Sequence, residues 1–301
     1  MERPRQLFFQ LYDALVSFGY EITAENPQNL NILRERPDDP AVIYFNHATK
    51  DDPFLIADVL HKFAPDRLAN VIVPVSHHHL QIKNAPDYAL TVPILGRGLA
   101  GFNMPPVVQG YRRRSDFVPD GLEEAAFKMN LHLARTLRAI LPTGPLLVIS
   151  PEGHRSDSRF LHPAEGGIAE MARMMVRLIH QGKIQNAHFI PLGLVFDNHQ
   201  GPKKLHFNLI NRSSVRVVIG PPQDVGSLLS QSRGRFAGAN TNAPGHYLME
   251  RLATLLPEDM HGFYAKEKIA DTYAERYESR LGADNKVCVW DKLEKKSIRI
   301  D

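Results

Sequence analysis

The chain has 301 residues, of which 43% are hydrophobic and 23% are charged, and these proportions are ordinary for a globular protein. Its formal net charge of +3 is too small to indicate nucleic-acid binding, although it suits an anionic substrate or a membrane surface. The single cysteine, Cys288, excludes an intrachain disulfide and is typical of a reducing compartment.

The N-terminal segment, Glu2–Gly19, is amphipathic. Its apolar residues recur at three- and four-residue spacing and predict a helix that ends at Gly19. Two interpretations stay open: a helix packed on the core, which Asp13 and the short length favour, and an interfacial helix lying on a bilayer. Asp13 and Glu21 interrupt any signal-peptide core, and no apolar run approaches the ~18 residues of a membrane span. We therefore expect a cytoplasmic protein, either free or peripheral to the membrane.

The next strong pattern is a buried strand, a polar turn and a helix. The run AVIYF predicts a strand over Ala41–Phe45, and Asp52-Pro53 is typical of a helix start, with Asp as the N-cap. His47 and Asp52 flank the turn. A histidine ordinarily titrates near pH ~6.5, and an adjacent carboxylate can fix its tautomer. The turn thus suggests a catalytic base and its orienting carboxylate; the alternative is a solvated histidine beside a helix cap.

The segment that follows is punctuated by Gly and Pro. Asn70–Val75 is expected to form a strand, and three histidines, His77–His79, come directly after it. Adjacent residues rarely converge on one ion, and no further ligands lie at the spacing of a metal site, so we expect no metal here. Val107-Val108 then precedes the basic run Tyr111–Arg114. One interpretation of this run is a solvated loop; another, binding of an anionic group, depends on the resemblance given below.

Helices and strands alternate over the middle of the chain. The apolar patterns predict two helices, Gly121–Leu141 and Glu165–Gln181, and four strands, Pro145–Ser150, Ala187–Phe196, Lys204–Leu209 and Ser213–Gly220. The first of these strands runs into a polar turn with Glu152, Gly153 and Arg155. Continuous apolar strands separated by helices predict an α/β fold in which helices flank a mixed central sheet. We expect the active site at the strand ends and a helical C-terminal extension.

Composition changes after Pro222. Gly226–Pro244 is rich in Ser, Gly and Asn and is expected to be a mobile loop. Tyr247–Leu256 and the heavily charged Lys266–Arg280 are predicted helices. Three interpretations of the tail, Lys286–Ile300, stay open: an edge strand, a partner contact and a membrane contact. We expect a domain of residues 1–225, including the N-terminal helix, followed by a loop and helical extension of residues 226–301.

Two polar turns together resemble motifs of the glycerolipid acyltransferase family, which contains lysophosphatidic acid and glycerol-3-phosphate acyltransferases. The family block N-H-x-x-x-x-D is matched by Asn46, His47 and Asp52. Its later block P-E-G-T-R-S is matched by Pro151, Glu152, Gly153, Arg155 and Ser156. His154 stands where the family usually has Thr.

Three further stretches follow in the family's order. Leu161, Pro163 and Gly167 resemble the L-x-P-x-x-x-G pattern at the start of a helix. Ile190-Pro191 and the last strand, Val215–Pro222, are similar to the family's closing apolar blocks. The resemblance covers residues 41–222 and implies the same α/β architecture.

The resemblance also implies a function, that of an O-acyltransferase of phospholipid biosynthesis. A fatty acyl group would pass from acyl-CoA or acyl-carrier protein to a hydroxyl of glycerol-3-phosphate, lysophosphatidic acid or another acceptor. His47 would act as general base and Asp52 would orient it. No metal or redox cofactor is expected.

The resemblance assigns acceptor binding to five residues. Arg112, with Arg113 as the alternate, and Arg155 would bind the acceptor phosphate, since guanidinium groups match phosphate oxygens. Glu152 would accept hydrogen bonds from acceptor hydroxyls, and Gly153 would let the backbone approach and add an N–H donor. The alternative for Glu152 and Arg155 is a mutual salt bridge in a loop.

Two other functions stay open. In a hydrolase, His47 would activate water to cleave a thioester or phosphoester, and the product would be free acid without esterified acceptor. A non-catalytic lipid-binding protein would keep the fold, but it would not need the four side chains of His47, Asp52, Glu152 and Arg155.

Overall fold

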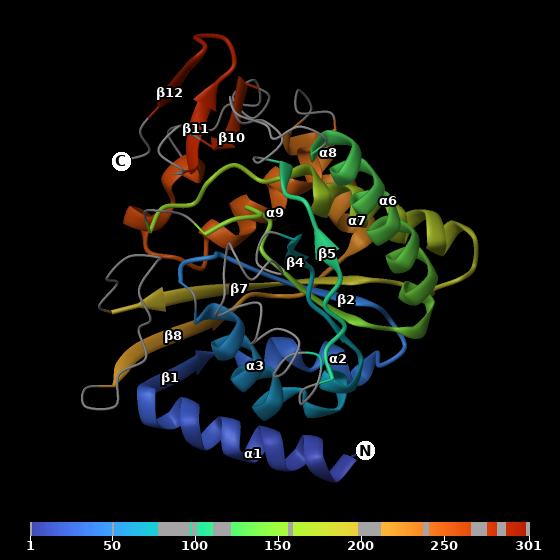
Figure 1. Ribbon diagram of the computed structural model, residues 1–301, viewed down its shortest axis with the longest axis vertical. Coiled ribbons are helices and arrows are strands. Elements are labelled where there is room, and N and C mark those ends of the chain that lie inside the picture. The colour runs from blue at the N-terminus through green and yellow to red at the C-terminus, as the bar shows by residue number, and fades with distance from the viewer. Residues whose placement is uncertain are drawn as a thin grey trace.

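A seven-stranded sheet runs through the middle of the molecule (Figure 1). The computed structural model describes residues 2–49, 51–77, 97, 101–110, 122–155, 159–197, 212–236, 241–265, 276–281 and 287–298. Six strands form the path β1-β8-β7-β2-β6-β3, and β9 pairs with β7. Their bounds are β1 Tyr20–Glu25, β2 Ala41–Phe45, β3 Val71–Ile72, β6 Leu146–Ile149, β7 His188–Phe196, β8 Ser213–Ile219 and β9 Gln223–Asp224.

The sheet is mostly parallel. β2 pairs in parallel with β6 and β7, β3 with β6, and β1 with β8, whereas β7 is antiparallel to β8 and β9. The predicted α/β fold with a mixed central sheet is therefore confirmed. Every residue of β2 and of β7 is buried, as expected for strands covered on both faces.

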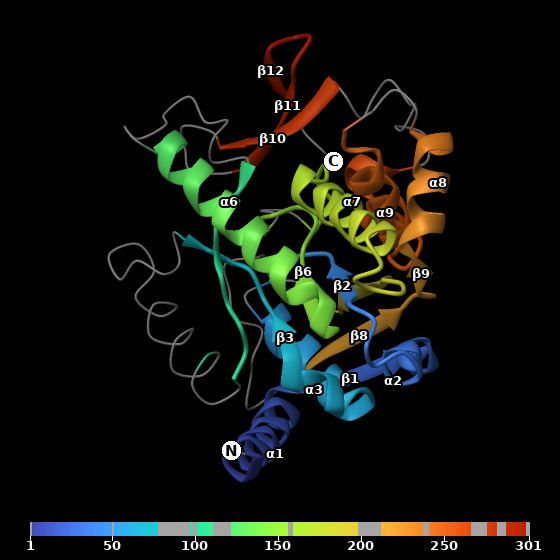
Figure 2. The ribbon, with the colours of Figure 1, turned by 90° about the vertical axis from the view of Figure 1, so that its right-hand side faces the viewer.

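Helices cover both faces of the sheet (Figure 2). On one side lie α1 (Glu2–Gly19), α2 (Ile32–Glu35) and α3 (Asp52–Phe63), and on the other α6 (Leu122–Ile140), α7 (Gly166–His180), α8 (Val225–Arg235) and α9 (Ala243–Ala253). Side chains of β2 alternate between two cores: Ile43 and Phe45 pack towards α3, and Val42 and Tyr44 towards α7 and α9. Short 3₁₀ helices occupy Pro27–Leu30, Pro65–Asn70, Leu141–Thr143, Glu258–Met260 and Gly262–Tyr264, the last labelled η8.

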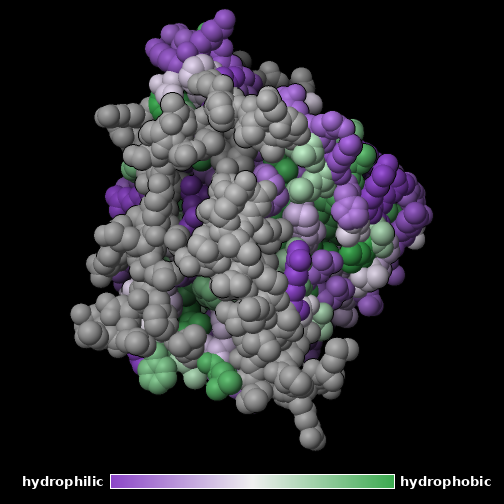
Figure 3. All heavy atoms as spheres, in the orientation of Figure 1, coloured by the Kyte–Doolittle hydropathy of each residue, from purple (hydrophilic) through white to green (hydrophobic). Residues whose placement is uncertain are grey.

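The N-terminal helix is present over the predicted range and packs on α3 by one side. Phe9 and Val16 are buried, and the Phe9 ring stacks on His61 of α3 at 4.9 Å between centroids. Leu11 and Phe18 are 64% and 60% exposed, and apolar atoms reach the surface over this helix in Figure 3. None of the described helices combines the length and the apolar character that crossing a membrane requires.

The predicted loop over Gly226–Pro244 is wrong, because α8 occupies Val225–Arg235 and α9 begins at Ala243. Asp224 caps α8 by accepting a hydrogen bond from the Ser227 backbone N–H at 2.9 Å. Val225 and Leu228 are fully buried in the same core as α7 and α9. Tertiary burial and a good N-cap therefore outweigh the low helix propensity of Ser and Gly. The boundary proposed at residue 225 stays a prediction.

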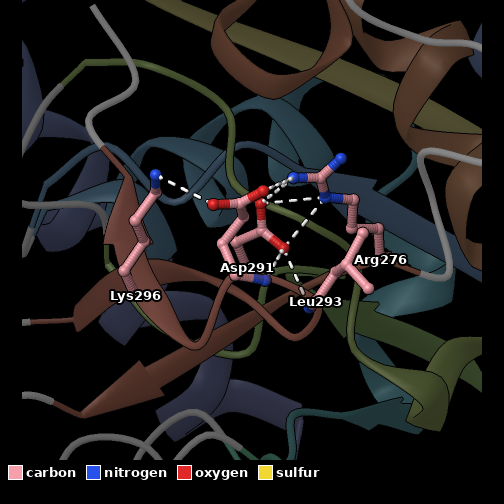
Figure 4. A network of polar contacts seen from close by, with 5 residues as sticks. Arg276, Asp291, Leu293 and Lys296 are labelled. Carbon is pink, nitrogen blue, oxygen red and sulfur yellow. Dashed lines mark hydrogen bonds and ion pairs between the residues drawn. The ribbon is translucent and has the colours of Figure 1, made fainter.

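The prediction of a helix over Lys266–Arg280 is wrong at the C-terminal end of that range, which the structure describes. Tyr277–Leu281 forms strand β10, which pairs antiparallel with β11 (Val287–Asp291), and β11 pairs with β12 (Lys296–Ile298). Asp291 organises this small sheet. Its carboxylate accepts bonds from Arg276 Nε at 2.8 Å and the Leu293 N–H at 2.9 Å (Figure 4). Hydrogen bonds from Arg276 hold the pKa of Asp291 well below its usual range.

Other predictions are refined or fall outside the described residues. The Asn70–Val75 strand is split into β3 and β4 (Val75–Ser76), and β4 pairs with β5 (Pro106–Val107). The predicted strand Lys204–Leu209, the arginines Arg112 and Arg113, and two of the three adjacent histidines lie outside the described ranges.

Candidate active site

Two polar turns meet at the carboxyl ends of β2 and β6. The two strands are parallel neighbours whose last pair in register is Tyr44 with Ile149. The chains therefore leave the sheet side by side, one into the His47 turn and the other into the Glu152 turn. This is the edge where an open α/β sheet ordinarily binds its ligand.

His47 and Asp52 face one another across the first turn. Nδ1 of His47 lies 2.8 Å from Oδ2 of Asp52, whose side chain is fully buried, while the His47 side chain is 24% exposed. The Thr49 backbone N–H lies 3.0 Å from Oδ2, and the Thr49 hydroxyl donates to Oδ1 at 2.7 Å. A buried carboxylate surrounded by donors and facing an accessible imidazole is the arrangement of a base and its orienting group.

The helix start differs from the expected one. Asp51 is the N-cap of α3 and Asp52 is the first helical residue, so the prediction that Asp52 caps the helix is wrong. The Asp52 carboxylate turns back to Thr49 and His47 instead of capping. Because the Asp52 carboxylate accepts a hydrogen bond from Nδ1, His47 carries its proton on Nδ1. The basic lone pair is then on Nε2, at the other side of the ring.

Asn46 anchors the same turn to the sheet. Its side-chain amide donates to the Leu194 carbonyl at 3.0 Å and accepts from the Leu194 N–H at 2.7 Å. This pair of bonds continues the ladder between β2 and β7 through a side chain, just beyond the last paired residue of β2. The position of His47 is thus fixed from the preceding residue as well as from Asp52.

Glu152 joins the two turns to a third segment. Its side chain is buried, Oε2 accepts the His47 N–H at 3.0 Å, and Oε1 accepts the His162 N–H at 2.9 Å. Burial raises the pKa of Glu152 to about 8, against the two backbone N–H bonds, which lower it. Both oxygens thus have protein partners, whereas the sequence suggested that they accept hydrogen bonds from acceptor hydroxyls.

His154 and His162 form a buried pair beside Glu152. His154 Nδ1 donates to the Glu152 carbonyl at 2.7 Å, and its Nε2 lies 3.2 Å from Nδ1 of His162. Because a carbonyl only accepts, His154 carries its proton on Nδ1 and His162 donates to its Nε2. Burial lowers the pKa of His162 to about 4. Sequence reasoning missed His162; the signal was the unusual His154, whose partner lies eight residues further on.

Gly153 and Arg155 complete the Glu152 turn. Gly153 adopts φ +70°, a left-handed conformation that favours glycine, and its N–H donates to the Ser150 carbonyl at 3.1 Å. Its N–H is therefore engaged in the turn, and the expectation that it donates to a substrate is not supported. Arg155 is half-buried at the end of this turn. Among the described residues, no group of three or more His, Cys, Asp or Glu side chains is arranged to hold a metal ion.

Comparisons with known proteins find a likeness in fold but no match in sequence. No family model matches the sequence, and no curated protein matches it. Among solved structures, the fold is similar to that of the 1-acyl-sn-glycerophosphate (LPA) acyltransferase PlsC from Thermotoga maritima, with a TM-score of 0.45 and 14% sequence identity. The similarity covers 84% of this chain and 77% of that chain.

Proposed function

We propose that this protein is an O-acyltransferase that moves a fatty acyl group from a thioester donor to a hydroxyl of a phosphorylated glycerol acceptor, as in phospholipid biosynthesis. The observation behind the proposal is the His47–Asp52 pair, with a fully buried carboxylate 2.8 Å from the imidazole of a partly exposed histidine. The motif blocks around both residues support acyl transfer as the reaction. We place the protein in the cytoplasm, free or at a membrane surface.

The reaction needs one proton carrier. The acceptor O–H gives its proton to Nε2 of His47 while its oxygen attacks the thioester carbonyl. The tetrahedral intermediate breaks its C–S bond, and the departing sulfur takes the proton from the imidazolium. Asp52 stabilises that imidazolium, and general-base help of this kind contributes ~10²–10⁴ in rate. A thioester is already activated, so no acyl-enzyme, metal or redox cofactor is required.

Acceptor recognition belongs to the neighbouring basic residues. Arg155, at the end of the Glu152 turn, and Arg112 or Arg113 would bind the acceptor phosphate through charge-assisted hydrogen bonds. Glu152 would position the two turns, since its oxygens accept the His47 and His162 N–H groups. The donor is acyl-CoA or acyl-carrier protein.

A thiol-release assay tests the proposal. Long-chain acyl-CoA or acyl-carrier protein is supplied with and without glycerol-3-phosphate or lysophosphatidic acid, and the lipid product is identified. We expect thiol release that depends on an acceptor and yields an esterified product. Release with free fatty acid as the product would instead identify a thioester hydrolase, and no release with either donor would contradict the proposal.

The chain supplies a matched control for the base. His61 of α3 also has Nδ1 2.8 Å from an aspartate, Asp13, and is also 24% exposed, but it lies at the opposite end of α3 from the His47 turn. We expect His47→Ala to lower kcat by ~10²–10⁴ and His61→Ala to leave kcat within twofold. Equal losses in the two variants would remove His47 from the reaction.

A further inference from the structure

The C-terminal elements form hydrogen bonds with a segment that itself forms hydrogen bonds with the candidate active site. Residues Phe160–Glu165, here the 160s segment, connect the Glu152 turn to α7. On one side the segment donates the His162 N–H to Glu152 at 2.9 Å and the Glu165 N–H to the Pro151 carbonyl at 2.8 Å. Glu152 in turn accepts the N–H of His47. Any displacement of the 160s segment therefore reaches the His47 turn through one carboxylate.

The other side of the 160s segment is held by Tyr264 of η8. The Tyr264 hydroxyl is buried, accepts the Ala164 N–H at 2.9 Å and lies 2.8 Å from Nδ1 of His246 in α9. Burial lowers the pKa of His246 to about 4, so its imidazole is neutral at pH 7, and its Nδ1 shares a hydrogen bond with the Tyr264 hydroxyl. One hydroxyl thus joins α9, η8 and the 160s segment.

Further contacts reinforce the same junction. Asn242, the N-cap residue of α9, donates from Nδ2 to the Ala164 carbonyl at 2.6 Å. The Leu161 N–H donates to the Met260 carbonyl, and the Phe263 N–H donates to the Leu161 carbonyl. A Cβ at Gly262, which has φ +52°, would come within 2.7 Å of the Leu161 carbonyl oxygen. The two segments are therefore in close backbone contact, with no room for an added methyl group.

We propose that Tyr264 is a positioning residue for His47 that acts through the 160s segment and Glu152. The proposal rests on the proposed function for its kinetic consequence, but not for its structural one. Tyr264 lies in the predicted C-terminal extension, residues 226–301. That part of the chain therefore contributes to the geometry of the active site.

The test compares two tyrosines that each lose only a hydroxyl. Tyr264→Phe keeps the buried ring and leaves Ala164 N–H and His246 Nδ1 without their partner. Tyr247→Phe is the control, because the Tyr247 hydroxyl on α9 bonds Gln231 and Gln223, on the side of α8 and β9. Hydrogen exchange read by mass spectrometry reports the His47 turn and the 160s segment without any need for turnover.

We expect Tyr264→Phe to speed exchange about tenfold in peptides over residues 45–49 and 160–165, the scale of one lost buried hydrogen-bond partner, and to leave β7 unchanged. Tyr247→Phe changes neither peptide. In the acyl-transfer assay Tyr264→Phe lowers kcat about tenfold and leaves the KM of both substrates within twofold. Unchanged exchange at residues 45–49, or equal acceleration across β7, would overturn the proposal.

A second variant covers poor folding of the first. Asn242→Ala removes the half-buried Nδ2 group, which donates to the Ala164 carbonyl and lies 3.4 Å from Nε2 of His246 in α9. The Asn242 side chain makes no cap hydrogen bond to α9, so no cap bond is lost. We expect the same exchange pattern, and its absence would count against the positioning role. If the wild-type protein catalysed no acyl transfer while the two variants showed these exchange changes, the proposed function would be refuted and the positioning role would stand.

Discussion

At the scale of residues, the orientation of His47 is determined mostly by residues within seven consecutive positions, Asn46–Asp52. Asn46 fixes the start of the turn, Thr49 supplies a backbone and a hydroxyl donor, and Asp52 places its carboxylate between Thr49 and His47. Among the described residues, Glu152 and Leu194 add hydrogen bonds from distant parts of the chain. Because most of the constraint is local, the sequence alone predicted the pair of His47 and Asp52, and it missed only which of two aspartates caps α3.

The most informative residue substitution is Asp52→Asn. The asparagine amide can present its NH₂ group to Nδ1 of His47, which then accepts a hydrogen bond and carries its proton on Nε2, so the base is lost. We expect kcat to fall ~10²–10⁴-fold while substrate KM changes little, because the side-chain volume is kept.

The control is Asp13→Asn, which alters the equivalent partner of His61. Acyl-transfer rates measured at saturating donor and acceptor should stay within twofold of wild type in that variant. If Asp52→Asn retained more than a third of the wild-type kcat, Asp52 would not set the tautomer of a catalytic histidine.

At the scale of elements, prediction succeeded where a pattern is local and failed where burial decides. β2 and α1 appear over the predicted ranges, and α3 begins at Asp52-Pro53, because a continuous apolar run, a terminal glycine and a Pro-marked start are all visible in sequence. The composition of Gly226–Pro244 suggested a loop, yet α8 forms because Val225 and Leu228 are buried against helices remote in sequence. β10 pairs with β11, and Arg276, directly before β10, donates to the carboxylate of Asp291 at the end of β11, a contact between residues 15 positions apart.

The cap of α8 is expected to matter for stability. Asp224 accepts the Ser227 N–H at 2.9 Å, and α8 is otherwise rich in Ser and Gly, so little intrinsic propensity replaces a lost cap. We expect Asp224→Ala to lower the free energy of unfolding by about 1 kcal/mol in urea titrations, and Asp224→Asn to retain most of it. Equal losses in both variants would show that the side-chain cap is not the stabilising feature.

At the scale of the whole molecule, the candidate site depends on contacts that span the chain. His47 and Glu152 are separated by 105 residues, and Ala164 and Tyr264 by 100. The sequence indicated the chemistry of each turn but not that His162 and Tyr264 would hold them together, because neither residue belongs to a local pattern. Such contacts follow from the parallel pairing of β2 with β6 and from the return of the C-terminal segment to the 160s segment.

Three buried groups of this network, His162, His246 and Glu152, predict how stability varies with pH. Burial lowers the pKa of His162 and of His246 from 6.5 to about 4, so between these values the unfolded chain binds more protons than the folded one, and stability falls as pH falls. Over that pH window, each histidine lowers the free energy of unfolding by about 3 kcal/mol as pH falls. Burial raises the pKa of Glu152 from 4.5 to about 8, so its contribution is present at low pH and is lost as pH rises towards 8.

The signs combine to a stability maximum near the pH at which histidines in the unfolded chain titrate, about 6.5. Below it, two histidine contributions decline while that of Glu152 grows, and above it only the loss from Glu152 remains. Urea unfolding between pH 4.5 and 8.5 would measure this profile, and other groups are cancelled by comparing variants with wild type. His162→Gln should reduce the slope on the acid side, whereas Glu152→Gln should flatten the alkaline side. A Glu152→Gln profile parallel to wild type above pH 6.5 would mean that Glu152 does not take up its proton on folding, and the buried carboxylate would then be an anion held by the His47 and His162 N–H groups alone.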